Sequence, residues 1–209
     1  MPELPEVETV RRSLLENIGA HIRQLEFRRT DIIRCADYPP EALAGKEILD
    51  IRRRGKYLIL DLEEPYHLLV HLGMSGRFYL QADNEQQILY RDTRRFGGVW
   101  FSLDPECLLA HMGPEPLGKA FTSRYLAAVC QNRKVAIKSL LLNQNLISGI
   151  GNIYADESLF EAKIRPDREA GSLTGAEIKR LHKAIKNVLQ SSIENCGTTF
   201  RDFRDGYNQ

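Results

Sequence analysis

The feature that most constrains the fold of this chain is a change in the spacing of its apolar residues across residues 105–122. Upstream, short apolar or alternating runs are separated by Gly, Pro, Asp or Asn, a pattern typical of antiparallel strands. Downstream, apolar residues recur at helical spacing. The change predicts an α+β fold with two domains. We expect an N-terminal antiparallel β-sandwich flanked by helices over 1–110, a linker over 111–122, and a helical domain over 123–209.

The expected elements of the first domain are one helix and several short strands. The helix is predicted over residues 5–18, with Pro5 in its first turn and Gly19 at its end. Its apolar stripe consists of Val7, Val10, Leu14 and Ile18. The strands are expected at 25–27, 48–51, 57–62, 67–72, 78–80, 88–90 and 98–101.

In the second domain, helices are expected at 125–130, 136–142 and 153–162, and a long one opens with the capping box Thr174 and Glu177. A turn containing Gly149 and Gly151 leads into Asn152, where a helix begins. Such a turn can present backbone N–H groups and an amide side chain to an anion such as phosphate. The alternative is an ordinary helix end followed by a tight turn.

Composition narrows the class of protein. The chain has 209 residues and a net charge of +1, with no long apolar run and no export signal, which favours a cytosolic protein without a membrane span. Its four cysteines form no C-x-x-C pair, which argues against zinc within this chain and predicts reduced, mostly buried thiols. Basic clusters at 28–34, 52–56 and 91–95 are either solvated faces or nucleic-acid patches.

One long motif bears on the role of the turn at Gly149 and Gly151. The segment KSLLLNQNLISGIGNIYADESLF at 138–160 resembles the helix-two-turn-helix of the formamidopyrimidine-DNA glycosylase family, whose relative is endonuclease VIII. Further motifs of that family appear in the same order along the chain: PELPEVET at 2–9, GKYL at 55–58, HLGMSG at 71–76, RRFG at 94–97 and GPEPL at 113–117.

The resemblance implies a catalytic centre at the N-terminus. Removal of Met1 leaves Pro2 as a secondary amine, and an α-amino group is partly neutral near physiological pH because its usual pKa is about 8. By resemblance, Pro2 attacks the sugar C1′ of a damaged nucleotide and forms a Schiff base, Glu3 protonates the opening sugar ring, Glu6 supports the site, and Lys56 belongs to the active site. A rigid lead-in to the helix is the alternative for Pro2.

The resemblance also assigns DNA contacts. His71, Asn152 and Arg94 are expected to contact DNA, and Arg94 in addition pairs with the base left behind when the damaged nucleotide is flipped out. Phe96 is expected to act as a wedge and Met74 to fill the void. Core packing for Met74 and Phe96, and a solvated face for Arg94, are the alternatives from position alone.

The function implied is that of a bifunctional glycosylase and abasic-site lyase of base excision repair. It would excise oxidised purines, chiefly 8-oxoguanine and formamidopyrimidines, from duplex DNA and then cut the strand by β,δ-elimination. The alternatives are an endonuclease VIII-like enzyme for oxidised pyrimidines and a non-catalytic protein that binds damaged DNA. A monomer without a cofactor in this chain is expected, in the bacterial cytoplasm and associated with the nucleoid.

Two departures from the family pattern bear on these expectations. The family ends in a four-cysteine zinc finger whose cysteines this sequence lacks, so a structural zinc ion is expected only if the native chain continues beyond residue 209. The segment between Met74 and Arg94 is also shorter than the family's. A truncated chain is the favoured explanation, and the 209-residue polypeptide would then bind lesions weakly and excise them slowly.

Overall fold

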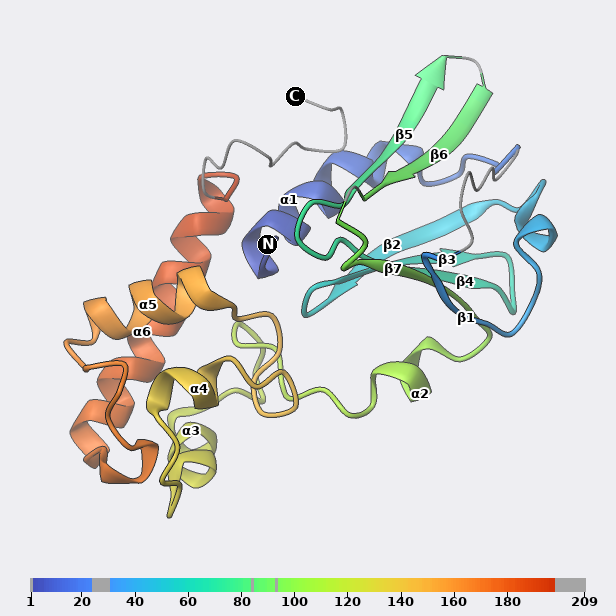
Figure 1. Cartoon of the computed structure of the whole chain (residues 1–209). Helices are drawn as coiled ribbons and strands as arrows, with labels where there is room; N and C mark the ends of the chain where they lie inside the picture. The colour runs from blue at the N-terminus through green and yellow to red at the C-terminus, as the bar shows by residue number, and fades with distance from the viewer. Residues whose placement is uncertain (1, 24–30, 84, 93, 198–209) are drawn as a thin grey trace. The chain divides into compact units, whose positions relative to one another are not determined.

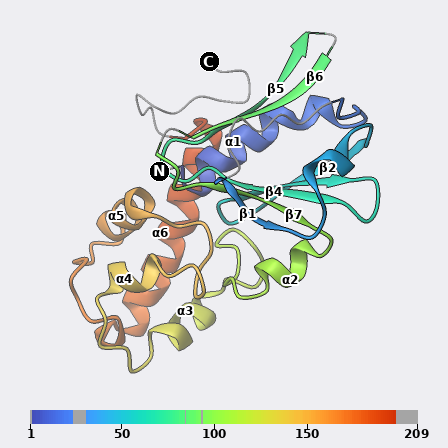
Figure 2. The ribbon, with the colours of Figure 1, turned by 45° about the vertical axis from the view of Figure 1, so that its right-hand side comes forward.

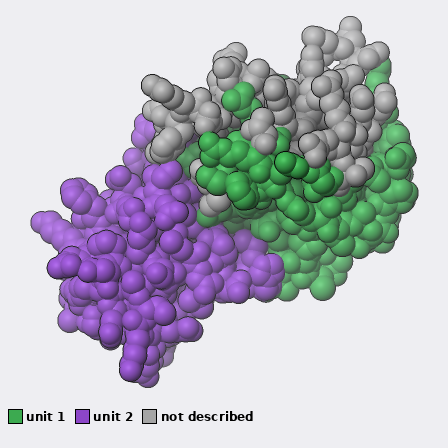
Figure 3. Space-filling view, in the orientation of Figure 1, with its two compact units in different colours: residues 1–2, 6–110, 198–209 green, residues 3–5, 111–197 purple. Residues whose placement is uncertain are grey.

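The computed structural model describes residues 2–23, 31–83, 85–92 and 94–197 (Figure 1). The chain divides into two compact units between Ala110 and His111, coloured separately in Figure 3. The first unit contains Pro2 and residues 6–110. The second contains residues 111–197 together with the short segment Glu3–Pro5. The residues that immediately follow Pro2 therefore belong to a unit formed mainly by sequence more than 100 residues away.

The first unit is built on a five-stranded sheet with the strand order β1-β7-β4-β3-β2. Its strands are β1 (Ile33–Ala36), β2 (Ile48–Arg54), β3 (Tyr57–Leu62), β4 (His67–His71) and β7 (Gly98–Ser102). A separate hairpin consists of β5 (Arg77–Asp83) and β6 (Glu85–Arg91). The short helix α2 (Pro105–Leu109) and the 3-10 turn η2 (Pro40–Leu43) complete this unit.

Helix α1 (Leu4–Leu14) lies between the sheet and the hairpin in both views (Figures 1 and 2). Val7, Val10 and Leu14 are buried in one core cluster with residues of β2, β3, β4 and β7, and Phe78 of the hairpin joins the same cluster. The 3-10 turn η1 (Leu15–Asn17) ends the helix before Ile18. Ile18 is 42% exposed, so the prediction that the helix and its buried stripe extend to this residue was wrong. Gly19 has φ +88°, as the predicted stop requires.

One pairing departs from the predicted antiparallel arrangement. Strands β1 and β7 run parallel, whereas the other pairs are antiparallel. A parallel pair needs a long connection, and the whole β2–β6 segment separates these two strands in the sequence. The strand at 33–36 was missed because three of its four residues are exposed and give no apolar run.

The second unit is helical. It contains α3 (Ser123–Cys130), α4 (Ile137–Leu141), α5 (Asn152–Glu161), the 3-10 turn η3 (Ala170–Ser172) and α6 (Gly175–Glu194). The predicted capping box at Thr174 and Glu177 is present at the start of α6, whose buried face includes Leu181 and Ile185. Helix α6 packs against α5 and α3, and the three helices share one hydrophobic core.

The predicted α+β class, with a sheet first and helices second, is confirmed. The strand predicted at 25–27 lies outside the described residues. The thiols were not mostly buried as predicted, because Cys130 is buried while the other three, Cys35, Cys107 and Cys196, are exposed and unbridged. Burial raises the pKa of the Cys130 thiol to about 11, so this sulfur is protonated and unreactive at neutral pH.

Candidate functional site

Three of the predicted active-site residues share an uncommon property, which is a buried charged side chain. Glu3, Glu6 and Lys56 are 2%, 3% and 6% exposed, and within the described ranges they are the buried members of the Asp, Glu, Lys and Arg set. Charged groups are rarely this buried unless they are paired or functional. Burial therefore singles out the same three residues without use of the family resemblance.

Glu3 is held by the start of helix α5. Its carboxylate accepts hydrogen bonds from the backbone N–H groups of Gly151 at 2.7 Å, Ile153 at 2.9 Å and Tyr154 at 3.3 Å. These donors belong to the first turn of the helix, which otherwise has no side-chain cap. The positive end of the α5 dipole lies at this N-terminus and stabilises a negative charge on the Glu3 side chain. These hydrogen bonds orient both oxygens of the Glu3 side chain and favour its ionised form.

The turn before α5 is shaped to receive the N-terminal segment. Gly149 has φ +86°, and a Cβ there would lie 2.7 Å from Cδ1 of Leu4. The Leu4 N–H donates to the Gly149 carbonyl at 3.1 Å, and the Gln144 side chain accepts from the Gly149 N–H at 2.8 Å. At Gly151 a Cβ would lie 2.4 Å from Cδ of Glu3. Glycine is thus required at both positions because the Glu3–Leu4 segment packs directly on the backbone.

The predicted role of this turn must be corrected in one respect. Its backbone N–H groups were expected to face an external anion, but those of Gly151, Ile153 and Tyr154 bind the carboxylate of Glu3. No sequence signal joined these residues, because the two partners are about 150 positions apart in the chain. Asn152, the first residue of α5, is exposed, so its side chain remains available for the predicted DNA contact.

Lys56 and His71 lie close together in the first unit. Lys56 follows Gly55, which has φ +57° in the turn between β2 and β3, and it immediately precedes Tyr57. Tyr57 is paired with His71 across β3 and β4, and the two rings lie 4.9 Å apart between centroids. The β-sheet register therefore brings two of the predicted site residues to one end of neighbouring strands.

The environment of His71 favours a neutral ring. Burial and the nearby Lys56 charge lower the pKa of His71 to about 4, although the Asp92 carboxylate acts in the opposite direction. Nδ1 accepts a hydrogen bond from the Gly73 N–H at 3.1 Å, which leaves Nε2 to carry the proton. The His71 ring is therefore uncharged at neutral pH.

Two large apolar side chains extend into solvent in the first unit. Met74 is 41% exposed and Phe96 is 66% exposed, so the core-packing alternative is wrong for both residues. Arg94, two positions before Phe96, is also exposed, and Arg95 between them has φ +60°, an uncommon conformation for a residue with a side chain. The exposed set Met74, Arg94 and Phe96 matches what a void-filling wedge requires.

Part of the second basic cluster is structural. Arg52 binds Asp61 and Glu106, which raises its pKa, and Arg53 donates to Glu8 at 3.2 Å and to the Gly55 carbonyl at 3.0 Å. These two guanidinium groups are ion-paired within the first unit. Neither the solvated face nor the nucleic-acid patch predicted for this cluster describes Arg52 and Arg53, because carboxylates of the same unit bind both side chains.

Pro2, the residue predicted to form the Schiff base, is half-buried.

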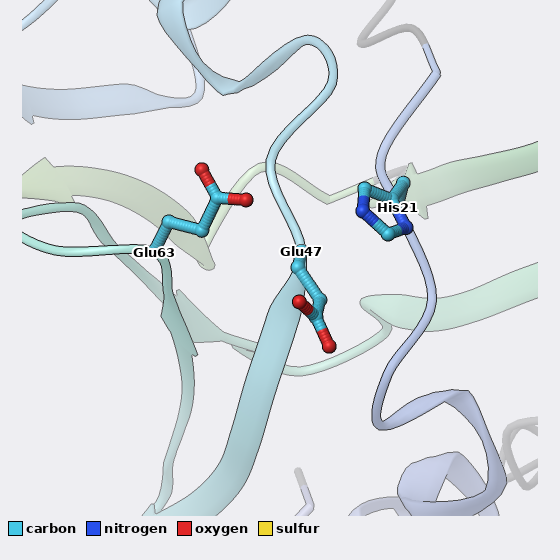
Figure 4. A group of neighbouring side chains, drawn as sticks. All are labelled: His21, Glu47 and Glu63. Carbon is cyan, nitrogen blue, oxygen red and sulfur yellow. The ribbon is translucent and has the colours of Figure 1, made fainter.

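A zinc ion does not fit the cysteines of this chain. They stand on β1, α2 and α3 and after α6, and no cysteine joins a metal-sized cluster within the described residues. The cluster found there is His21, Glu47 and Glu63, shown in Figure 4. The histidine of this cluster is exposed, and Lys46 already binds the Glu63 carboxylate at 3.1 Å, so we assign the cluster no metal.

Within the described residues, every helix is too short or too polar to span a bilayer.

Comparison with known proteins agrees with this geometry. The N-terminal domain of formamidopyrimidine-DNA glycosylase matches residues 1–99, and its helix-two-turn-helix domain matches residues 112–204. The formamidopyrimidine-DNA glycosylase of Syntrophomonas wolfei is 52% identical, with 100% of this chain and 84% of that protein covered. The corresponding protein of Pelotomaculum thermopropionicum is 43% identical at the same coverage.

Solved structures give the same result. The MutM (Fpg) protein of Thermus thermophilus superposes with a TM-score of 0.88 at 36% identity, covering 100% of this chain and 83% of that chain. A Lactococcus lactis Fpg variant in complex with DNA containing Fapy-dG superposes with a TM-score of 0.91 at 33% identity, covering 99% and 84%. The similarity thus extends over both units.

The two matching domains define a DNA glycosylase of base excision repair with a helix-two-turn-helix unit. More particularly, the chain belongs to the formamidopyrimidine-DNA glycosylase family.

Proposed function

We propose that this protein is a bifunctional glycosylase and abasic-site lyase that removes oxidised purines from duplex DNA through a Schiff base on Pro2. The observation that carries the proposal is the carboxylate of Glu3, which directly follows Pro2 and is oriented by three backbone N–H groups. A fixed, buried carboxylate next to an α-amine supplies a base and a nucleophile in adjacent residues.

The proposed chemistry begins once Met1 is removed. The neutral nitrogen of Pro2 attacks C1′ of the damaged nucleotide, the bond from C1′ to the base breaks, and the base leaves with the bonding electrons. Glu3 takes the proton released from the Pro2 nitrogen. As the C1′–O4′ bond opens, Glu3 returns this proton to O4′, and the chain is then joined to the sugar as an iminium ion. Glu3 begins this sequence as a carboxylate, which agrees with its hydrogen bonds in the structure.

Strand cleavage follows from the same iminium ion. The positive nitrogen makes the neighbouring C2′–H acidic, so loss of that proton expels the 3′ phosphate by β-elimination, and a second elimination expels the 5′ phosphate. Buried Lys56, near His71 at the end of β3 and β4, is proposed to hold the phosphates that flank the lesion. Glu6 is proposed to balance the charge of this group of residues.

Access to the damaged nucleotide requires that it leave the helix stack. Exposed Phe96 and Met74 have the size and polarity to replace it, and Arg94 has donors for the base that remains. Asn152, at the start of α5, is proposed to bind the DNA backbone.

The choice of oxidised purine as substrate rests on the PELPE start at 2–6 and on the relatives. One Lactococcus lactis Fpg structure contains Fapy-dG DNA, and another contains DNA with an oxidised pyrimidine. Oxidised pyrimidines are therefore the second candidate substrate, and duplexes with each lesion should be compared.

Borohydride trapping tests the covalent step. The protein is incubated with an 8-oxoguanine duplex and sodium borohydride, and the adduct is located by mass spectrometry after digestion. We expect a reduced adduct on the N-terminal peptide that begins with Pro2. Binding of the duplex without any adduct would overturn the enzymatic proposal and favour the non-catalytic alternative.

A matched pair of variants makes the test specific for Glu3. Glu3→Gln preserves the shape of the side chain and Pro2 but removes the carboxylate, and we expect trapping to fall by about 100-fold or more. Glu157→Gln, an exposed position on α5, serves as the control and should trap like the unaltered protein. Equal trapping by both variants would contradict the role of Glu3.

A further inference from the structure

The three proposed void-filling residues stand on two separate loops of the first unit. Met74 belongs to the loop between β4 and β5, and Arg94 and Phe96 belong to the loop between β6 and β7. When Met74 and Phe96 enter the base stack together, the resistance of the stacked bases acts on both loops at the same time. The two loops must then keep a fixed position relative to each other. The contacts between these loops therefore matter for insertion.

The two loops touch through their backbones. A Cβ at Gly73 would lie 2.3 Å from the Gly97 nitrogen and 2.6 Å from the carbonyl carbon of Phe96. Gly73 also has φ +61°, a conformation that glycine adopts without strain. This close approach places the loops side by side, but it supplies no directional bond that would hold them in register.

Asp92 supplies those bonds. Its Oδ1 accepts from the hydroxyl of Ser75 at 3.0 Å and from the backbone N–H of Arg94 at 3.1 Å, and its Oδ2 accepts from the backbone N–H of Gly97 at 2.8 Å. Ser75 directly follows Met74, while Arg94 and Gly97 bracket the Phe96 segment. One carboxylate thus ties the Met74 loop to both ends of the Phe96 loop.

Arg34 binds the backbone carbonyl groups of the loop that carries Phe96. Its guanidinium donates to the Gly97 carbonyl at 2.7 Å and to the Arg95 carbonyl at 3.0 Å. The Arg34 side chain crosses Gly98 so closely that a Cβ there would lie 2.5 Å from its Cγ. Arg34 stands on β1, the strand that pairs in parallel with β7. The loop that carries Phe96 therefore donates backbone N–H groups to Asp92 and accepts hydrogen bonds from Arg34 at its backbone carbonyls.

We propose that Asp92 is a positioning residue that holds Met74 and Phe96 as a single rigid wedge for insertion into DNA. This inference rests on the proposed function, because it presupposes that these two side chains enter the duplex. Asp92 does not need to touch DNA for this role. Asp92 affects base extrusion by fixing the two loops that it joins. Arg34 helps by binding the backbone carbonyls of the loop that carries Phe96.

The physical benefit of this clamp is preorganisation. Loops that are already ordered lose less conformational freedom when they enter the DNA, so less of the interaction free energy is spent on ordering them. Without the carboxylate, the Ser75 hydroxyl and two backbone N–H groups lose this acceptor, and the hydrogen-bonded link between the two loops is broken. Base extrusion should then slow, whereas the chemistry at Pro2 should not.

The test separates extrusion from chemistry with three measurements on Asp92→Ala and Asp92→Asn. The first is the rate of fluorescence increase of 2-aminopurine placed beside 8-oxoguanine, which reports unstacking. The second is single-turnover excision of 8-oxoguanine. The third is borohydride trapping on a single-stranded oligonucleotide with a preformed abasic site, which requires no extrusion. We expect the first two rates to fall about 10-fold to 100-fold, with trapping changed by less than about twofold.

Asp31→Asn is the matched control, because Asp31 is an exposed carboxylate that binds the same loop at Arg95, at 3.4 Å. This variant should behave like the unaltered protein in all three measurements. If Asp92→Ala fails to fold by circular dichroism, Asp92→Asn and Ser75→Ala replace it, and slower unstacking by either of them supports the proposal.

Three results would overturn the proposal. Unstacking by the Asp92 variants at the unaltered rate excludes a positioning role, an equal fall in trapping assigns Asp92 to the chemistry or the fold, and an equal effect of Asp31→Asn indicates a general charge effect. If the unaltered protein unstacks the duplex yet forms no adduct, the proposed function fails while the fluorescence series still decides the role of Asp92.

Discussion

The turn around Glu3 and the two loops that carry Met74 and Phe96 use their backbone in opposite ways. In the second unit, backbone N–H groups of the turn bind the functional side chain itself, and that side chain is 2% exposed. In the first unit, hydrogen bonds with Asp92 and Arg34 fix a loop backbone that carries Phe96 into solvent at 66% exposure. On the proposed function, stability and activity at the turn depend on the same atoms. In the loops, backbone contacts provide the stability, and the proposed activity depends on exposed side chains.

The largest effect on stability should come from the backbone contact between the loops. Gly73→Ala adds a Cβ 2.3 Å from the Gly97 nitrogen at φ +61°, and we expect a loss of about 3 kcal/mol in the free energy of unfolding. Gly45→Ala is the control, because Gly45 has φ +82° with no atom within 4 Å of a Cβ. It should lose only about 1 kcal/mol in urea denaturation. Equal losses would mean that the close approach carries no energy.

The next effect concerns the turn. Glu3→Gln replaces a charged acceptor with an amide whose NH₂ group faces backbone donors, so we expect a loss of about 2 kcal/mol in the free energy of unfolding, measured in urea. Glu157→Gln should stay within about 0.5 kcal/mol of the unaltered protein. A Glu3→Gln protein that loses activity but no stability would refute the idea that one set of atoms serves both purposes.

A smaller effect is expected from His71, whose pKa of about 4 lies below the ordinary value near 6.5. Between these values the unfolded chain binds a proton that the folded protein does not, so the His71 contribution destabilises the protein as the pH falls through this window. Allowing for the partial exposure of the ring, His71→Gln should reduce the stability lost between about pH 7.5 and about pH 5 by about 1 kcal/mol. An unchanged pH profile in urea denaturation would contradict this assignment.

The smallest effect on stability should accompany a large effect on activity. Phe96→Ala removes a side chain that is 66% exposed, so the free energy of unfolding should change by less than about 0.5 kcal/mol while 8-oxoguanine excision falls. Leu49→Ala, at a residue that is 48% exposed on β2, should change neither property. A Phe96 variant with unchanged excision would remove the wedge from the proposed mechanism.

Much of the fold could be predicted from the sequence because it follows from local periodicity. The strand at 57–62 and the capping box of α6 are fixed by neighbouring residues, and both were located correctly. Ile18 was misplaced because its spacing fits the stripe, but a 3-10 turn ends the helix before it. The strand at 33–36 has no apolar run, so only its long-range pairing with β7 reveals it.

The candidate site could be predicted only in part. Pro2, Glu3 and Lys56 came from the family resemblance, and the burial of Glu3 and Lys56 is independent support for their importance. The partners of Glu3 on α5 and the clamp on Asp92 were not foreseen, because neither contact leaves a periodic pattern in the sequence. Hydrogen bonds from a side chain to a distant backbone depend on the folded path of the chain.

The membership of Glu3–Pro5 in the second unit has a consequence for the order in which the protein becomes reactive. Pro2 is among the first residues made by the ribosome, whereas Gly151, Ile153 and Tyr154 emerge about 150 residues later. A nascent chain that has completed its sheet still lacks the donors that orient the Glu3 carboxylate. Glu3 therefore reaches its oriented state only when the helix-two-turn-helix has been made, so on the proposed mechanism Pro2 becomes reactive together with the unit expected to bind DNA.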